Sequence, residues 1–200
     1  MNLSLYIEEI INATRKHRYW LFFSVFLFIS GIMCGIIIDK PLNLEIYYRD
    51  YCSDLIYNII DKNQSALLLF LSQFFNCILL IVFCIPGGVI VYFLPLQCII
   101  IFYKGFLFGT TCAIIITSYS LNGILILALI MIPQQLIFCV ILILLNCSAY
   151  ENAVYNNKCG RYSFTPYSQA VILAIFASAA AAVLELVTIL ALIRPLNFIL

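Results

Sequence analysis

Two ionisable residues, Lys104 and Glu185, lie inside long apolar stretches of the sequence. A charged side chain is costly to bury in a membrane, so such residues are candidate functional positions. Lys104 lies about eight residues from the nearer end of its stretch, and its long stem can carry the ammonium back to the headgroups. Glu185 reaches less far, so it requires a bound proton or a polar partner. The two residues fall at different depths, and we do not expect a direct ion pair.

The sequence offers little for a catalytic or metal site. The only histidine, His17, lies in a basic cluster, so a serine or cysteine nucleophile has no obvious base. There is no carboxylate pair, metal-ligand spacing or glycine-rich phosphate loop. The nine cysteines form no C-x-x-C pair, and most lie in apolar stretches, where free cysteine behaves as a small hydrophobic residue. We therefore expect a protein that is not an enzyme and uses no cofactor.

Small residues mark candidate packing positions. Gly31-x-x-x-Gly35 and Gly105-x-x-x-Gly109 are motifs that let two membrane helices approach closely. The last apolar stretch carries a further set at helical spacing, made up of Ala170, Ala174, Ala177, Ser178 and Ala181. We interpret this set as tight packing inside the protein. The alternative is association with a second protein, or of the chain with itself.

The sequence Pro133-Gln134-Gln135 falls in the middle of another apolar stretch. A proline there frees a backbone carbonyl, and two adjacent amides in lipid need polar partners. We expect a kinked helix with a small internal polar cluster.

These positions require helices that cross a membrane. Hydrophobic residues make up 65% of the 200 residues and charged residues only 10%, with a net charge of +1. Soluble domains average about 25% charged residues, so this chain lacks the charges to cover a water-facing surface. Its near-neutral charge, without a basic stripe, does not favour nucleic acid as a partner. We expect membrane lipids to surround an all-α bundle that forms a single membrane domain.

Crossing a bilayer requires roughly 20 apolar residues in a helix. Five stretches satisfy this length, and we predict membrane spans at about 19–38, 66–85, 96–117, 123–145 and 167–193. A short turn at 118–122 separates the third span from the fourth, and a polar stretch at 146–166 precedes the fifth. The apolar bridge at 86–95 stays open, because a re-entrant or sixth segment there changes the parity of every later span.

The distribution of lysine and arginine predicts the orientation. Arg15, Lys16 and Arg18 precede the first span, which places the amino terminus in the cytoplasm. The segment 41–64 is then external. Its apolar residues recur at steps of three and four, as in an amphipathic helix lying on the outer face of the membrane.

A more specific pattern spans 94–145. It consists of a proline before an apolar helix (Pro95), K-G-x-x-x-G (Lys104-Gly105 to Gly109), N-G (Asn122-Gly123) and a P-Q sequence (Pro133-Gln134). In order and spacing this pattern resembles the stage II sporulation protein M family. The basic amino terminus, the glycine pair of the first span and the five spans in about 200 residues agree with the resemblance.

The resemblance implies a role in endospore formation. It implies a non-catalytic scaffold in the mother-cell membrane that anchors and localises peptidoglycan-degrading enzymes during engulfment. The implied partners are the stage II sporulation proteins D and P. The alternative is a small membrane permease or channel subunit, which Glu185, Lys104 and the predicted kink in the fourth span motivate.

Overall fold

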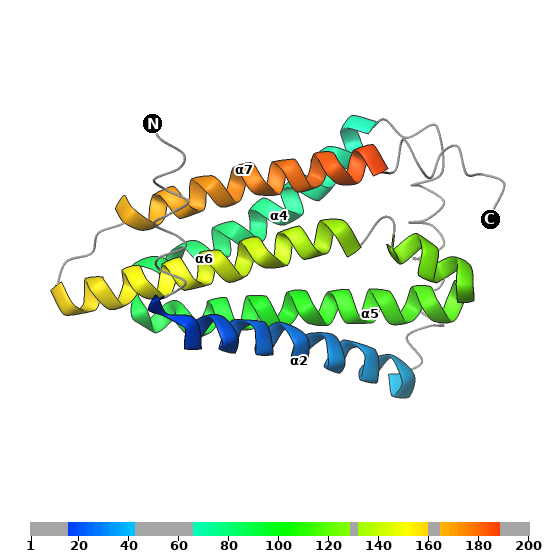
Figure 1. Ribbon diagram of the computed structural model, residues 1–200, viewed down its shortest axis with the longest axis horizontal. Coiled ribbons are helices and arrows are strands. Elements are labelled where there is room, and N and C mark those ends of the chain that lie inside the picture. Colours follow the sequence, from blue (N-terminus) through cyan, green and yellow to red (C-terminus); the bar gives the residue numbers. More distant parts are fainter. Residues whose placement is uncertain (1–15, 43–65, 129–131, 160–164, 189–200) are drawn as a thin grey trace.

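Five long helices form from the apolar stretches of the chain. The computed structural model describes residues 16–42, 66–128, 132–159 and 165–188, and over these ranges it is a helical bundle (Figure 1). The helices are α2 (Arg18–Leu42), α4 (Ala66–Val89), α5 (Leu94–Ile126), α6 (Ile132–Cys159) and α7 (Thr165–Thr188). Each is long and apolar enough to cross a membrane, which confirms the predicted class of fold.

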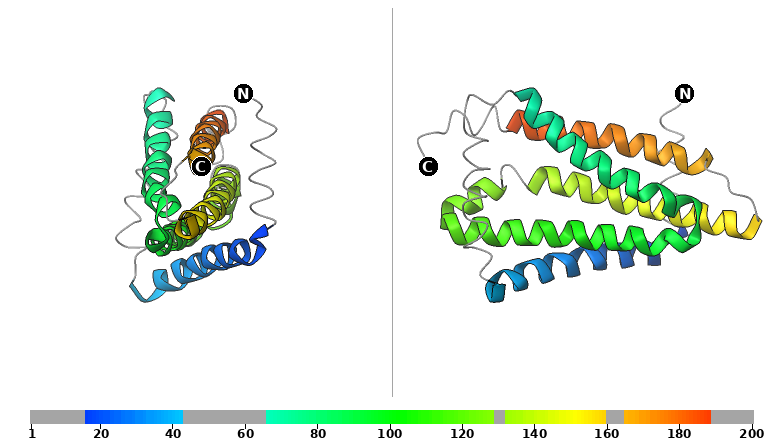
Figure 2. Two further views of the ribbon diagram at one scale, coloured as in Figure 1. Left: turned by 90° about the vertical axis from the view of Figure 1, so that its left-hand side faces the viewer. Right: turned by 180° about the vertical axis from the view of Figure 1, so that it is seen from behind.

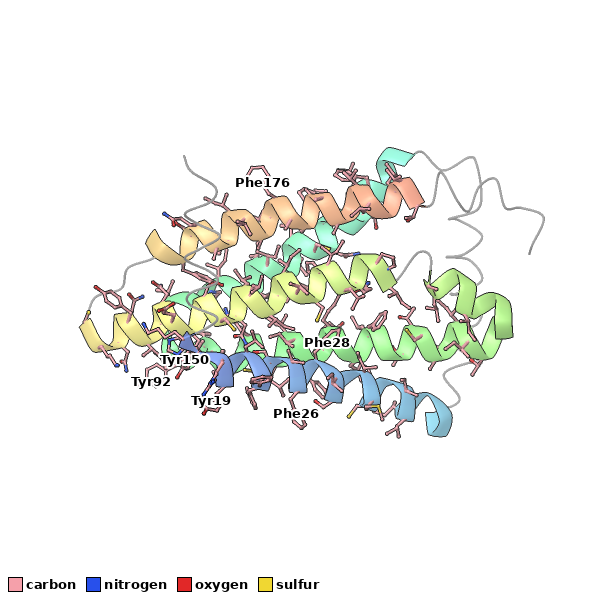
Figure 3. The ribbon with its side chains drawn as sticks, viewed as in Figure 1. Tyr19, Phe26, Phe28, Tyr92, Tyr150 and Phe176 are labelled. Carbon is pink, nitrogen blue, oxygen red and sulfur yellow. The ribbon has the colours of Figure 1, made fainter. Side chains whose placement is uncertain are left out.

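The helices run antiparallel in sequence order, with α2 on one side of the bundle. It packs mainly against α5, whereas α4, α6 and α7 contact one another in pairs. Figure 2 shows this arrangement from the end and from behind. Buried apolar side chains of α4, α5, α6 and α7 form the core, including Ile81, Ile101, Phe138, Leu142 and Ala174. Large apolar residues such as Phe26 and Phe176 point outward, as Figure 3 shows, which is the arrangement expected of a surface that faces lipid.

The open question at 86–95 is resolved by a tight corner between α4 and α5. Helix α4 continues through Pro86 to Val89, and a single 3-10 turn, η1 (Val91–Phe93), leads into α5. The amide of Ile90 donates to the Pro86 carbonyl at 3.1 Å, and the amide of Phe93 donates to the Ile90 carbonyl at 3.0 Å. Residues 86–95 therefore form the end of α4, the 3-10 turn and the start of α5. They add no membrane crossing to this part of the chain.

The predicted turn at 118–122 is helical, because α5 continues to Ile126. The ribbon turns back on itself within this last part of α5, so the chain reverses close to the predicted position (Figure 1). The fourth long helix starts later than predicted, at Ile132 instead of residue 123. Pro133 consequently lies in its first turn and does not interrupt it. A proline is favourable there, because the amides of the first turn have no partner within the helix.

The predicted polar stretch at 146–166 differs most from the structure. Helix α6 continues to Cys159, so residues 146–159 form its last turns. Asn146, Asn152 and Asn156 are buried. The polar composition of this stretch did not reveal a helix, because these three asparagines face neighbouring helices instead of water.

Candidate functional site

The two glycine motifs form one seam between α2 and α5. A Cβ placed on Gly31 would overlap the backbone carbonyl oxygen of Phe102, and one on Gly35 would overlap that of Phe106. Both glycines of α2 are buried. The backbones of the two helices therefore touch where any other residue would hold them apart.

The seam is reciprocal, since the glycines of α5 approach α2 in the same way. A Cβ on Gly105 would overlap the carbonyl oxygen of Phe28, and one on Gly109 would overlap that of Ile32. Figure 3 shows Phe28 between the two helices. Both motifs are thus used for packing between two helices of the same chain.

A second seam joins the amino-terminal part of α2 to α6, beginning at the end of the bundle. Lys16 Nζ and Glu151 Oε1 form an ion pair at 2.9 Å. Next to this ion pair, the rings of His17 and Tyr150 make a T-shaped, edge-to-face contact with centroids 5.1 Å apart. These contacts hold the start of α2 against α6.

The same seam continues inward with one stacked pair and one hydrogen bond. The Trp20 ring stacks on Tyr150 with centroids 4.4 Å apart. Asn146 Nδ2 donates to Ser24 Oγ at 2.8 Å, and both residues are buried. Ser24 in turn donates to the Trp20 carbonyl at 2.9 Å. A buried amide is costly unless it is hydrogen-bonded, so Ser24 provides the partner that Asn146 needs.

A cluster of neutral polar side chains surrounds the last two turns of α4. Gln97 of α5 and Tyr167 of α7 both donate to the carbonyl oxygen of Cys84, the tyrosine at 3.1 Å. Gln97 Nε2 also lies 3.3 Å from Tyr167 Oη. Gln97 is 0% exposed and Tyr167 1%.

Two asparagines of α6 complete this cluster at the end of α4. Asn152 Nδ2 donates to the Gly88 carbonyl at 2.7 Å, and Asn156 Nδ2 donates to the Val89 carbonyl at 3.2 Å. The last carbonyls of a helix have no partner in the helix itself and cannot stay bare in a membrane. We call Gln97, Asn152, Asn156 and Tyr167 the α4 capping cluster. The two asparagines satisfy the last carbonyls of α4, and Gln97 and Tyr167 add hydrogen bonds to the Cys84 carbonyl about one turn earlier.

Lys104 lies on α5 and faces α6. Its ammonium is 5.2 Å from the centroid of the Phe138 ring, a residue of the buried core. This contact differs from the predicted path of the side chain toward the headgroups. An aromatic face stabilises a cation where water is excluded, so Phe138 offsets part of the cost of burying the charge.

The small residues of α7 face the inside of the bundle. Ala170, Ala174, Ser178 and Ala181 are buried, and Ala177 packs against the core. Their predicted role in packing within the protein is confirmed. Their small side chains let α7 lie close to α4 and α6.

Several predicted positions lie outside the part of the chain whose side chains the structure describes. The backbones of Asn122 and Gly123 belong to α5, that of Gln134 to α6 and that of Glu185 to α7. The structure does not describe their side chains. The segment 41–64, which the sequence predicts to be external, falls outside the described ranges, apart from the last two residues of α2.

The α4 capping cluster and Asn146 were missed by sequence reasoning. Asn152 and Asn156 are four residues apart, the spacing of one helix face, but their place in a polar stretch indicated a loop. Gln97 lies two residues after Pro95 and was counted as part of the apolar stretch predicted at 96–117. The residues of the α4 capping cluster differ from other polar residues only in their shared target, the carbonyls of α4, and Asn146 differs only in its bond to Ser24.

Five membrane-length helices, a lipid-facing surface and polar residues used for contacts between helices define a polytopic α-helical membrane protein. The family described as stage II sporulation protein M matches residues 24–193, which is most of the chain. The chain belongs to this family and is a sporulation membrane protein, as the pattern at 94–145 predicted. No curated protein and no solved structure match the chain.

Proposed function

We propose that this protein is a non-catalytic scaffold of the engulfment machinery. In this role it anchors and localises peptidoglycan-degrading enzymes in the mother-cell membrane, with the stage II sporulation proteins D and P as its partners. Membership of the sporulation family supports the setting. The fixed geometry of the bundle supports the role of an anchor.

The observation that carries the proposal is how the buried polar residues are used. The side-chain amides of Gln97, Asn146, Asn152 and Asn156 donate to groups of other helices. Such contacts fix the relative positions of helices, which is what a scaffold requires. A polar pathway for a transported solute has no comparable support, so the permease alternative is not favoured.

The proposed contact region lies at the end of the bundle opposite the α4 capping cluster. The carboxyl end of α2, the amino end of α4 and the reversal at the end of α5 are all at this end of the bundle (Figure 1). With the amino terminus in the cytoplasm, this end lies on the outer side of the mother-cell membrane. Enzymes that cut peptidoglycan act on that side.

Copurification from sporulating cells tests the proposal. Tagged protein, extracted in mild detergent during engulfment, should bring down the D and P proteins, and it should localise to the asymmetric septum. Recovery of well-folded protein without either enzyme contradicts the proposal. Absence from the septum during engulfment contradicts it as well.

A replacement variant locates the contact. Exchanging residues 43–64 for a glycine–serine linker of equal length leaves all five helices in place. The expected result is unchanged thermal stability in detergent and reduced recovery of the enzymes. Its matched control is Asn157→Leu, a substitution of an exposed residue at the other end of the bundle, which should leave recovery unchanged.

A further inference from the structure

Three exposed tyrosines gather at the end of the bundle where α2 begins. Tyr19 of α2 is 78% exposed, Tyr92 of η1 is 92% exposed and Tyr155 of α6 is 59% exposed. Figure 3 shows Tyr19 and Tyr92 at this same end of the bundle. Tyrosine is enriched at the level of the headgroups, where its ring meets the acyl chains and its hydroxyl meets water.

The three elements that carry these tyrosines are bound to one another. The Lys16–Glu151 pair ties the start of α2 to α6. The hydrogen bonds from Asn152 and Asn156 tie α6 to Gly88 and Val89, directly before η1. The tyrosines therefore form a fixed belt around one end of the protein.

Cationic side chains lie at the same end of the bundle as the tyrosines. Lys16, Arg18 and Lys158 lie at this end, and among the described residues there the acid is Glu151. Because Lys16 pairs with Glu151, Arg18 and Lys158 face the surroundings without a carboxylate partner in this part of the structure. The Arg18 guanidinium lies 5.4 Å from the centroid of the Tyr19 ring, so this cation lies against one of the three tyrosines.

The opposite end of the bundle leads into a segment of the other sign. Residues 43–65, which connect α2 to α4, contain four acidic residues and two basic ones. The two ends therefore present different charges to the two surfaces of a membrane. Anionic headgroups complement the end that carries the tyrosines, and they are repelled by the other.

We propose that Tyr19, Arg18, Tyr92, Tyr155 and Lys158 form a binding surface for anionic phospholipids. The tyrosine rings lie against the upper acyl chains, and Arg18 and Lys158 donate hydrogen bonds to the phosphates. This surface concerns lipid recognition and is independent of the proposed scaffold function. Since both cations are exposed, the binding must weaken as salt screens them.

The only tryptophan, Trp20, follows Tyr19 and reports on the lipids next to the belt. Purified protein is reconstituted in vesicles of equal parts phosphatidylglycerol and phosphatidylcholine. One lipid at a time is brominated at a shallow acyl position, and quenching of Trp20 emission is measured. We expect phosphatidylglycerol to be enriched near Trp20 by about threefold over phosphatidylcholine at low salt. High salt should reduce this preference.

The variant Arg18→Gln combined with Lys158→Gln should abolish the preference without changing thermal stability. Lys40→Gln is the matched control, because it removes a cation at the other end of α2 and should retain the preference. A second reporter, Phe22→Trp in a Trp20→Phe background, places the indole on the exposed face of α2. Equal quenching by both lipids with both reporters overturns the proposal. A preference that survives the double substitution overturns the assignment to Arg18 and Lys158.

Discussion

At the scale of single residues, the glycines of α2 and α5 determine how close two helices come. Membrane helices gain little from the hydrophobic effect when they associate, because lipid is as apolar as their side chains. Close backbone contact and dispersion must then provide the attraction. Gly31, Gly35, Gly105 and Gly109 make that contact possible, since each faces a carbonyl oxygen of the opposite helix.

A branched side chain in the seam should separate α2 from α5. We expect Gly109→Val to lower the free energy of unfolding by about 2 kcal/mol or more, because the new side chain meets the backbone of Ile32. Thermal unfolding in detergent measures the effect. Ala180→Val creates the same branched side chain at an exposed position of α7 and serves as the control. Equal stability of the two variants contradicts the role of the seam.

The asparagines of α6 act through hydrogen bonds that replace water. Asn152→Leu keeps the approximate size of the side chain but leaves the Gly88 carbonyl without its donor. We expect a loss of about 1–3 kcal/mol in the free energy of unfolding. Asn157→Leu, at the exposed neighbouring side of the same helix, should change stability little. Unfolding curves of both variants in one detergent decide the matter, and a neutral Asn152→Leu refutes the capping role.

At the scale of elements, the limits of α6 decide which residues meet. A start at Ile132 places Pro133 in the first turn. An end at Cys159 carries Asn152 and Asn156 up to the corner between α4 and α5. A helix that ended near residue 145, as the sequence predicted, would leave the last carbonyls of α4 without these donors.

The start of α6 can be tested with proline substitutions. Pro133→Ala should change the free energy of unfolding by less than about 0.5 kcal/mol, because no hydrogen bond of the helix is affected. Val140→Pro, at a lipid-facing position inside α6, should cost about 3 kcal/mol. Helical content and thermal unfolding measure both effects. A large change in helical content from Pro133→Ala would indicate a kink inside a longer helix.

At the scale of the whole molecule, the order of the helices places Arg18 and Cys159 at one end and Leu42 and Thr188 at the other. This arrangement agrees with the sidedness that the sequence predicts for the connecting segments. The predicted cytoplasmic amino terminus then assigns the basic end with the tyrosines to the cytoplasm. The segment 41–64 is assigned to the outer face.

Two cysteines allow this orientation to be measured. Cys52 lies in the segment 41–64, and Cys159 is exposed at the end of α6. In single-cysteine variants, an impermeant maleimide should label Cys52 in intact protoplasts and Cys159 only after permeabilisation. The reverse pattern contradicts the cytoplasmic amino terminus. Labelling of both from the same side contradicts the three crossings by α4, α5 and α6 between them.

The sequence by itself determined the class of fold and the number of long helices. The thickness of a bilayer fixes the length of an apolar helix, so five such stretches could be counted directly. The glycine motifs were also evident, because small residues at a spacing of four have one main use in membrane helices. The order of motifs at 94–145 indicated the family that the comparison then confirmed.

Only the tertiary structure decided which polar residues are internal. Asn146, Asn152 and Asn156 are of a residue type that is also common in solvated loops. Whether they are buried depends on which helices lie opposite them. Their hydrogen-bond partners Ser24, Gly88 and Val89 lie far from them in the sequence. A local sequence pattern does not show which distant residues become neighbours in the fold. A helix in lipid can extend through polar residues wherever another helix offers them hydrogen bonds, and that condition exists only once the bundle has formed.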